Sequence, residues 1–195
     1  MKSEGGDCRK IKSIRVVFEG AGNFPVILIT GTPGTGKSTI IKRAKEANAS
    51  IQVLNISEFV KREGLHDGYD AEFDTFIIND RKTQKKLMKT IPEMKKSGPV
   101  LIECHSCGLF DEDEMEKLVD KVVVLTCSTE KLYDRLMARG YSKKKIDENM
   151  ECEIMMVCKD EAGEVFRGEG VVSEFANDTE EDQKVILSHI MKSCY

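Results

Sequence analysis

The chain has 195 residues, a length that fits one domain able to bury a substantial core. Hydrophobic residues make up 40% of it and charged residues 33%, as in a soluble globular protein. No apolar run approaches the roughly 20 residues that a membrane-spanning helix needs. The net charge of −4 argues against binding nucleic acid through overall charge, although it does not exclude a local basic surface. One basic run, residues 143–145, we interpret as a solvated helix end.

The first 24 residues are polar and charged apart from a short apolar patch at 16–18, so we do not expect them to be a secretory signal. We expect residues 1–23 to be a flexible extension, in which 14–18 could add an edge strand. The seven cysteines are scattered and odd in number, which indicates reduced thiols. A C-x-x-C spacing occurs at 104–107, but no second pair completes a four-ligand zinc site.

From residue 24 onward, predicted strands and helices alternate along the chain. Apolar, β-branched runs predict strands at 24–30, 51–56, 100–102, 122–125 and 171–175. Apolar spacing and end signals predict helices at 38–48, 57–61, 80–96, 129–139, 144–165 and 179–192. Ser57 is the expected cap of the second helix, and the polar stretch at 64–76 resembles a loop or a small substrate-gripping region. This alternation predicts an α/β fold with a parallel, doubly wound sheet.

The strongest motif is G-x-x-x-x-G-K-[ST], which occurs at 31–38 directly after the first predicted strand. Its glycines let the backbone wrap around phosphates, and the next helix presents its positive N-terminus to the same oxygens. Lys37 can bridge the β- and γ-phosphates of ATP, and the Ser38 hydroxyl can ligate Mg²⁺. The motif therefore predicts ATP·Mg²⁺ binding by a three-layer P-loop NTPase sandwich.

A second candidate position lies where the strand at 100–102 ends, at Glu103 and His105. P-loop enzymes place the acid of the magnesium shell at such a strand end, so Glu103 is the expected metal partner of Ser38. His105 emerges at the same edge and could orient a water or accept a proton near neutral pH. The alternatives are a surface charge for Glu103 and a structural role for His105.

Arg135 and Arg139 are four residues apart and therefore share one helical face. Together they could stabilise a phosphoryl group in transfer, or they could form an exposed basic helix end that complements the helix dipole. The N-K-x-D element of guanine-specific GTPases does not occur in the sequence, which argues against a switch GTPase.

These segments together resemble the adenylate kinase isoenzyme 6 family, the coilin-interacting nuclear ATPases. The resemblance runs from about residue 24 to the C-terminus. It is carried by residues 31–39, 67–70 and 103–105, and most specifically by 135–141, 144–145 and 148–154. Ordinary adenylate kinases share the P-loop but not the stretch from Arg-Gly-Tyr to Glu-Cys-Glu-Ile, so that stretch selects the subfamily.

The resemblance implies a nucleoside-monophosphate (NMP) kinase core with a small NMP-binding region and a short lid. Family members transfer phosphate from ATP to AMP, more weakly to other monophosphates, and they hydrolyse ATP. They are nuclear and cytoplasmic, and they assist maturation of the small ribosomal subunit by binding one of its ribosomal proteins. We expect no membrane association and no sequence-specific binding of nucleic acid.

The family pattern also implies roles for individual positions. The donor phosphates would be held by Gly34, Thr35, Gly36, Lys37, Ser38 and Thr39. Arg135 and Arg139 would belong to the lid arm and act in catalysis with Lys37 and His105, and Arg135 would also contact ATP. Asn177 would fall near the donor base. Residues 57–61 and 68–74 would frame the monophosphate site.

Several positions depart from the family pattern. Glu103 stands where an aspartate is usual, Ser106 where a glycine is usual, and Asn79-Asp80 replaces a more acidic run. Lys61 stands where an arginine is usual, which removes a bidentate grip on the acceptor phosphate. Two compatible functions stay open: an NMP kinase with ATPase activity, and an ATP-driven assembly factor with little kinase activity. A kinase for another small metabolite is disfavoured by the match over 135–154.

Overall fold

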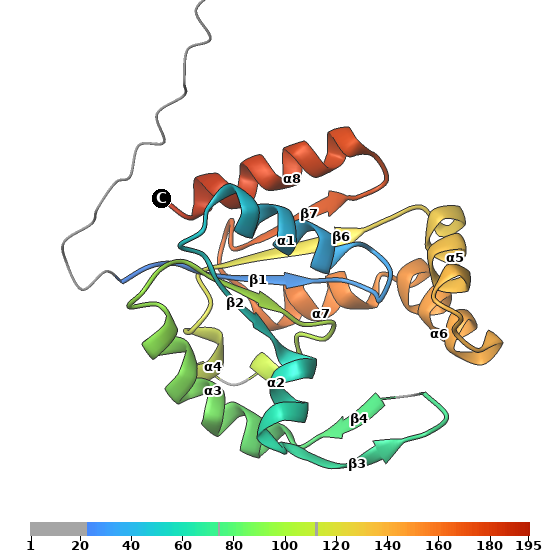
Figure 1. Ribbon diagram of the computed structural model, residues 1–195, viewed down its shortest axis with the longest axis horizontal. Coiled ribbons are helices and arrows are strands. Elements are labelled where there is room, and N and C mark those ends of the chain that lie inside the picture. Colours follow the sequence, from blue (N-terminus) through green and yellow to red (C-terminus); the bar gives the residue numbers. More distant parts are fainter. Residues whose placement is uncertain (1–22, 74, 112) are drawn as a thin grey trace, which may run out of the picture.

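A computed structural model describes residues 23–73, 75–111 and 113–195 (Figure 1). The predicted extension at 1–23, with its candidate strand at 14–18, lies outside them except for Asn23. A central sheet of five parallel strands has the order β2-β5-β1-β6-β7. The strands are β1 Val26–Thr30, β2 Gln52–Asn55, β5 Val100–Glu103, β6 Lys121–Thr126 and β7 Val172–Ala176. The predicted α/β fold with a parallel sheet is therefore confirmed.

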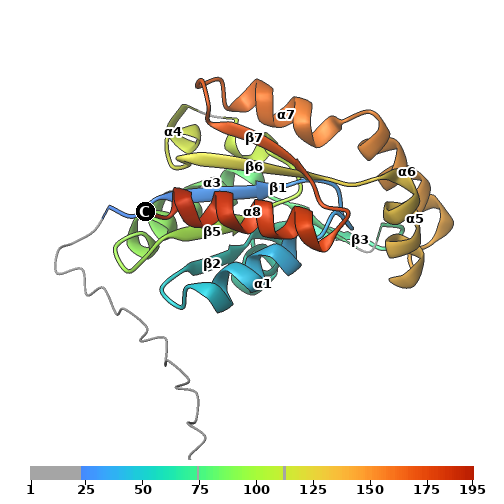
Figure 2. The ribbon, with the colours of Figure 1, turned by 90° about the horizontal axis from the view of Figure 1, so that it is seen from above.

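Helices cover both faces of this sheet and make three layers (Figure 2). One face carries α1 Lys37–Ala47 and α8 Glu180–Ser193. The other carries α3 Asp80–Met94, η1 Gly108–Phe110, α4 Asp113–Glu116 and α7 Val157–Val165. Within the described ranges, no helix combines the length and the apolar character that crossing a membrane would need.

Strand β1 shows why a continuous apolar run forms the centre of the sheet. Its side chains alternate between the two layers: Val26 and Leu28 belong to the core beside α3 and α7, and Ile27 and Ile29 to the core beside α1 and α8. All four are fully buried. Because both faces are covered, every position of the strand gains from burial, and the polar alternation of a half-exposed strand is absent.

Two regions extend from the sandwich at the carboxyl end of the sheet (Figure 1). The first consists of α2 Ile56–Glu63 and an antiparallel hairpin of β3 His66–Asp70 and β4 Thr75–Ile78. The second is an arm of α5 Thr129–Ala138 and α6 Lys143–Ile154, which pack around a small apolar cluster of their own. The stretch 64–76 therefore contains strands where a loop was one prediction. Its described side chains, at 64–73 and 75–76, are half-buried or exposed, so the sequence lacks the apolar run that signals a covered strand.

The ends of three helices also differ from the predictions. The cap of α2 is Asn55, whose side chain accepts a hydrogen bond from the Glu58 backbone N–H, and Ser57 lies inside the helix. The helix predicted at 144–165 is two helices, because Met156 has a φ of 56° and turns the chain. This break lets α6 pack on α5 while α7 packs on the sheet.

We expect the Leu101→Ala variant to lose about 2–5 kcal/mol in free energy of unfolding, because Leu101 is fully buried in β5, an interior strand between β2 and β1. Val53→Ala is the matched control, since Val53 lies on the neighbouring strand β2 but is 40% exposed; its expected loss is below about 1 kcal/mol. Urea unfolding followed by circular dichroism measures both. Equal losses would contradict the assigned core.

Candidate active site

The P-loop joins β1 to α1 through a turn that only glycine fits. Gly31, Gly34 and Gly36 have φ values of 135°, 105° and 97°. A Cβ atom on Gly36 would lie 2.3 Å from the Asn177 side-chain nitrogen. The loop backbone can therefore follow a path closed to other residues, and α1 begins at Lys37 with its N-terminus toward the cavity described next.

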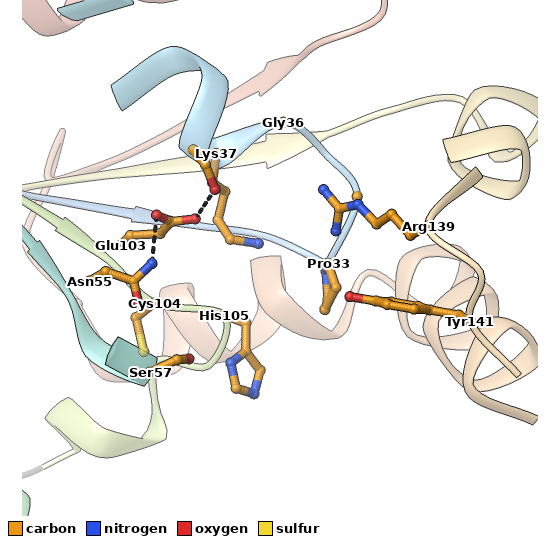
Figure 3. Close-up of a pocket in the computed structure, with 12 residues that line it drawn as sticks. Pro33, Gly36, Lys37, Asn55, Ser57, Glu103, Cys104, His105, Arg139 and Tyr141 are labelled. Carbon is orange, nitrogen blue, oxygen red and sulfur yellow. Dashed lines mark hydrogen bonds between the residues drawn. The ribbon is translucent and has the colours of Figure 1, made fainter. Parts of the chain in front are cut away.

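A cavity of 230 Å³ lies beside the P-loop, between the carboxyl ends of β2 and β5 and the segment after α5 (Figure 3). Most of the predicted site residues line it: Gly34, Gly36, Lys37, Ser38, Glu103, His105 and Arg139. The other predicted residues do not. Thr35 is buried within the loop, Thr39 is exposed in the first turn of α1, and Arg135 and Asn177 lie behind the loop.

The Lys37 side chain crosses the P-loop, and the residue is only 8% exposed. Its Nζ donates hydrogen bonds to the carbonyl oxygens of Gly31 and, at 3.1 Å, of Thr32. Burial lowers the pKa of Lys37, and the nearby Glu103 carboxylate opposes that effect. A buried ammonium group is poorly solvated, so pairing with an anion in the cavity stabilises it. Lys37 is therefore suited to bind a phosphate there.

Glu103 ends β5 beside the P-loop hydroxyl that was predicted as its partner. Its Oε1 accepts a hydrogen bond from Ser38 Oγ at 2.6 Å, and its Oε2 accepts one from Asn55 Nδ2 at 2.8 Å (Figure 3). Asn55 was not predicted, although it ends β2 in register with Glu103. Hydroxyl and carboxylate oxygens are the ligands that Mg²⁺ prefers, so Ser38 and Glu103 fit a magnesium ion.

His105 projects into the same cavity, across from Lys37 (Figure 3). The residue is exposed, although nearby protein atoms partly desolvate its ring. This partial desolvation and the Lys37 charge lower the pKa of His105, and the Glu161 carboxylate opposes them. This environment favours the neutral imidazole, which can accept a proton.

The loop that carries His105 is held in place by α7. The His105 carbonyl oxygen accepts a hydrogen bond from Cys158 Sγ at 3.2 Å, and the Glu161 carboxylate accepts one from the Cys107 backbone N–H at 3.0 Å. Burial raises the pKa of Cys104 to about 11 and of Cys107 to about 12, so both are protonated thiols at neutral pH. In the part of the chain that the structure describes, no three His, Cys, Asp or Glu side chains group as a metal site.

The two predicted arginines occupy different places. Arg139 lines the cavity, and its guanidinium faces the P-loop (Figure 3). Arg135 instead donates hydrogen bonds to the carbonyl oxygens of Gly34 at 3.2 Å and Asn177 at 3.0 Å. Asn177 is 1% exposed, and its Nδ2 donates to the Thr35 carbonyl oxygen at 2.7 Å. Arg135 and Asn177 thus support the P-loop from behind.

Glu153, in the last turn of α6, contacts the P-loop but was not predicted as a site residue. Its carboxylate accepts hydrogen bonds from Thr32 Oγ1 at 2.5 Å and from the Cys127 backbone N–H at 2.8 Å. The Thr32 carbonyl oxygen in turn accepts from Lys37. Glu153 therefore connects the arm to Lys37 through Thr32. Glu153 lies in the stretch 148–154 that carries the family resemblance, which marks the segment as important. No local sequence pattern indicated that its side chain contacts Thr32.

A larger cavity of 870 Å³ adjoins the first one, between the P-loop, α2, the β3–β4 hairpin and α6. Four residues line both cavities: Pro33, Ser57, His105 and Tyr141. Aromatic side chains and two ammonium groups lie on the remaining wall: Tyr69, Phe73, Phe76, Lys61 and Lys145. The volume is within the usual range of small-molecule sites, and the predicted segments 57–61 and 68–74 both contribute to the wall.

Comparisons with known proteins give consistent results. Residues 27–156 match the family described as AAA domain. The adenylate kinase isoenzyme 6 homolog of Schizosaccharomyces pombe is 39% identical, over 86% of this chain and 90% of that protein. The homolog of Caenorhabditis elegans is 38% identical, over 85% and 87%. The homolog FAP7 of Saccharomyces cerevisiae is 36% identical, over 86% and 80%.

Among solved structures, shikimate kinase of Bacteroides thetaiotaomicron has a TM-score of 0.54, with 87% of this chain and 97% of that chain covered. At 14% identity, this likeness concerns the fold alone.

We expect Glu153→Ala to weaken ATP binding at least tenfold, because the loss of two hydrogen bonds to a carboxylate, each worth about 1.5–3 kcal/mol, frees Thr32 and the loop around it. A fluorescent ATP analogue measures the affinity. The exposed Glu151, in the same helix, provides the control variant Glu151→Ala. Thr32→Val should add little to Glu153→Ala. Equal affinities for the two glutamate variants would contradict the role of Glu153.

We expect His105 to titrate below its ordinary pKa of 6.5, because burial and Lys37 disfavour the imidazolium. Folding then favours the neutral ring. Its contribution to stability is therefore full above pH 6.5 and is lost as the pH falls through the folded pKa. NMR titration of the histidine ring signals, assigned with His105→Asn, measures this. A midpoint at or above 6.5 would contradict the assigned environment.

Proposed function

Because this chain belongs to the adenylate kinase isoenzyme 6 family of P-loop, nucleotide-kinase-like proteins, we propose that it transfers the terminal phosphate of ATP to AMP, and more weakly to other nucleoside monophosphates. The observation that carries this proposal is the pair of cavities that meet at Pro33, Ser57, His105 and Tyr141. The smaller cavity, beside the P-loop, takes the donor phosphates. The larger cavity takes the acceptor nucleotide. A phosphoryl group can then pass between them without leaving the protein.

The smaller cavity offers cationic and oxygen-rich groups where the donor phosphates would lie. Lys37 and Arg139 face it with positive charge, which stabilises the negative charge on a phosphoryl group in transfer. Ser38 and Glu103 would hold Mg²⁺, which when bound neutralises charge on the β- and γ-phosphates. The acceptor phosphate attacks directly, so no covalent intermediate with the protein is required.

The larger cavity has the properties that a nucleotide acceptor needs. Its aromatic side chains offer flat apolar surfaces for a base, and Lys61 and Lys145 offer positive charge for a phosphate. Lys145 already donates to the Phe73 carbonyl oxygen at 2.5 Å and lies 4.4 Å from the centre of the Tyr141 ring. Lys61 forms no such hydrogen bond with a backbone carbonyl in the described part of the chain and is exposed, so we assign it the acceptor phosphate.

A second function of the same site is ATP hydrolysis. His105 faces both cavities, and its neutral ring can orient a water or accept its proton. The Lys61 ammonium is a single point charge, whereas an arginine guanidinium would bind the acceptor phosphate through two parallel hydrogen bonds. Binding of the acceptor is therefore weaker, which favours hydrolysis. By resemblance to the family, we extend the proposal to an ATP-dependent role in maturation of the small ribosomal subunit through one of its proteins, in the nucleus and cytoplasm.

An ADP-production assay with ATP alone, and then with AMP, CMP, dAMP or UMP, tests the kinase proposal. We expect AMP to give the largest acceleration, and Lys61→Ala to raise the KM for AMP about tenfold or more, because one charge-assisted hydrogen bond worth about 1.5–3 kcal/mol is lost. ATP-only hydrolysis should be unchanged in that variant. Arg62→Ala is the control, since Arg62 adjoins Lys61 but does not line the cavity.

Two results would decide against parts of this proposal. If no monophosphate raises ADP production above the ATP-only rate, the kinase function is wrong and hydrolysis is the activity. If Lys61→Ala and Arg62→Ala change the KM for AMP equally, the acceptor phosphate lies elsewhere. His105→Gly separates the two functions further, since it should reduce hydrolysis more than transfer.

A further inference from the structure

Helix α3 and the two residues after it differ in charge from the rest of the protein. Residues 80–96 contain seven basic and two acidic residues, a net charge of +5. The rest of the chain contains 23 basic and 32 acidic residues, a net charge of −9. An acidic protein that concentrates its positive charge on one helix presents a local positive field despite its overall charge. Figure 1 shows α3 along the edge of the molecule.

The contacts of α3 leave one of its sides uncovered. Leu87 and Ile91 point into the core. On one flank, Gln84 donates a hydrogen bond to the Leu109 carbonyl oxygen at 3.1 Å. On the other flank, Lys82 and Lys86 form ion pairs with acids of the α2–β3 region. Three sides of the helix are thus occupied by packing or by paired charge.

The fourth side bears Arg81, Lys85 and Lys89, which we call the basic stripe. These residues are spaced by four, so they follow one line along the helix about 6 Å apart, opposite the buried side. All three are exposed, and none forms an ion pair with a residue that the structure describes. Three like charges held in a row without compensation repel one another, so an anion that bridges them lowers the energy.

We propose that the basic stripe of α3 binds the phosphate backbone of duplex nucleic acid, with RNA as the test case and without regard to base sequence. A row of lysine and arginine side chains is the usual means of phosphate contact, and it carries no base readout. The stripe has no aromatic residue on which an unpaired base could stack. Regularly spaced phosphates of a duplex therefore match it better than a single strand.

Other polyanions fit the stripe less well. The cores of protein–protein interfaces are poor in lysine and rich in aromatic anchors, and the stripe consists of charges alone. An anionic membrane needs an apolar helix face to enter the bilayer surface, whereas the apolar face of α3 is buried in the core. The active site also binds phosphate, but through residues of other elements, so the two sites can be tested separately.

The test measures binding of the full chain to a labelled 20-base-pair RNA duplex by fluorescence anisotropy at several salt concentrations. The stripe variant is Arg81→Gln, Lys85→Gln and Lys89→Gln. The matched control is Lys42→Gln, Lys184→Gln and Lys192→Gln, which removes three exposed lysines from α1 and α8 on the opposite layer. Residues 1–22, with five basic and three acidic residues, are kept in both variants.

We expect binding at 50 mM salt that weakens steeply as salt rises. The stripe variant should bind at least tenfold more weakly, with a salt slope smaller by about 3, because each phosphate contact contributes about 1. The control should keep most of the affinity. Unchanged thermal unfolding and ATP binding in both variants show that the fold is intact. Two duplexes of different sequence should bind equally, and saturating ATP should not compete.

Several results would overturn the proposal. Absence of binding at 50 mM salt, or equal losses in the stripe and control variants, would remove the site. Competition by ATP would place the duplex at the active site. Binding of an acidic peptide that depends on the stripe, with no binding of the duplex, would make the stripe a protein-binding surface.

Discussion

The P-loop between β1 and α1 keeps its conformation only through hydrogen bonds from other elements, although its glycines allow that conformation. Positive φ at Gly31, Gly34 and Gly36 opens a path for the backbone, and a loop so rich in glycine gains little rigidity from local contacts. Its carbonyl and hydroxyl groups are held from outside, by Arg135 of α5, Asn177 after β7 and Glu153 of α6. The geometry offered to a phosphate is therefore set by elements spread over the second half of the chain.

The break at Met156 divides one predicted helix into α6 and α7, and each of them supports a different part of the site. Before it, Glu153 connects the arm to Thr32 in the P-loop. After it, Cys158 and Glu161 of α7 hold the loop that carries His105. One short segment thus supports both sides of the cavity, so the position of the arm and the position of His105 are linked. Such a link suits a site in which enclosure of the nucleotides determines whether water reaches the phosphate.

The net charge of the chain does not reveal the basic surface that α3 forms in the fold. A net charge of −4 argued against affinity for nucleic acid, and the run at 143–145 was the only basic segment that stood out in the sequence. In the fold, Lys144 pairs with Glu72, and Lys145 is bound to the Phe73 carbonyl oxygen, so part of that run is already used. The basic stripe on α3 has no ion-pair partner among the described residues, and helical spacing aligns its three side chains, which the sequence places four apart.

The sequence by itself determined the alternation of strands and helices along the sandwich, the P-loop motif and the pairing of Ser38 with Glu103. Those features follow from apolar periodicity, from glycine spacing and from the rule that parallel strands end at one edge. Only the tertiary structure decided that Arg135 and Asn177 support the loop from behind, that Glu153 reaches Thr32, and that two cavities meet at His105. These contacts join residues about 40 to 140 positions apart, and no local pattern records which distant partner a side chain will meet.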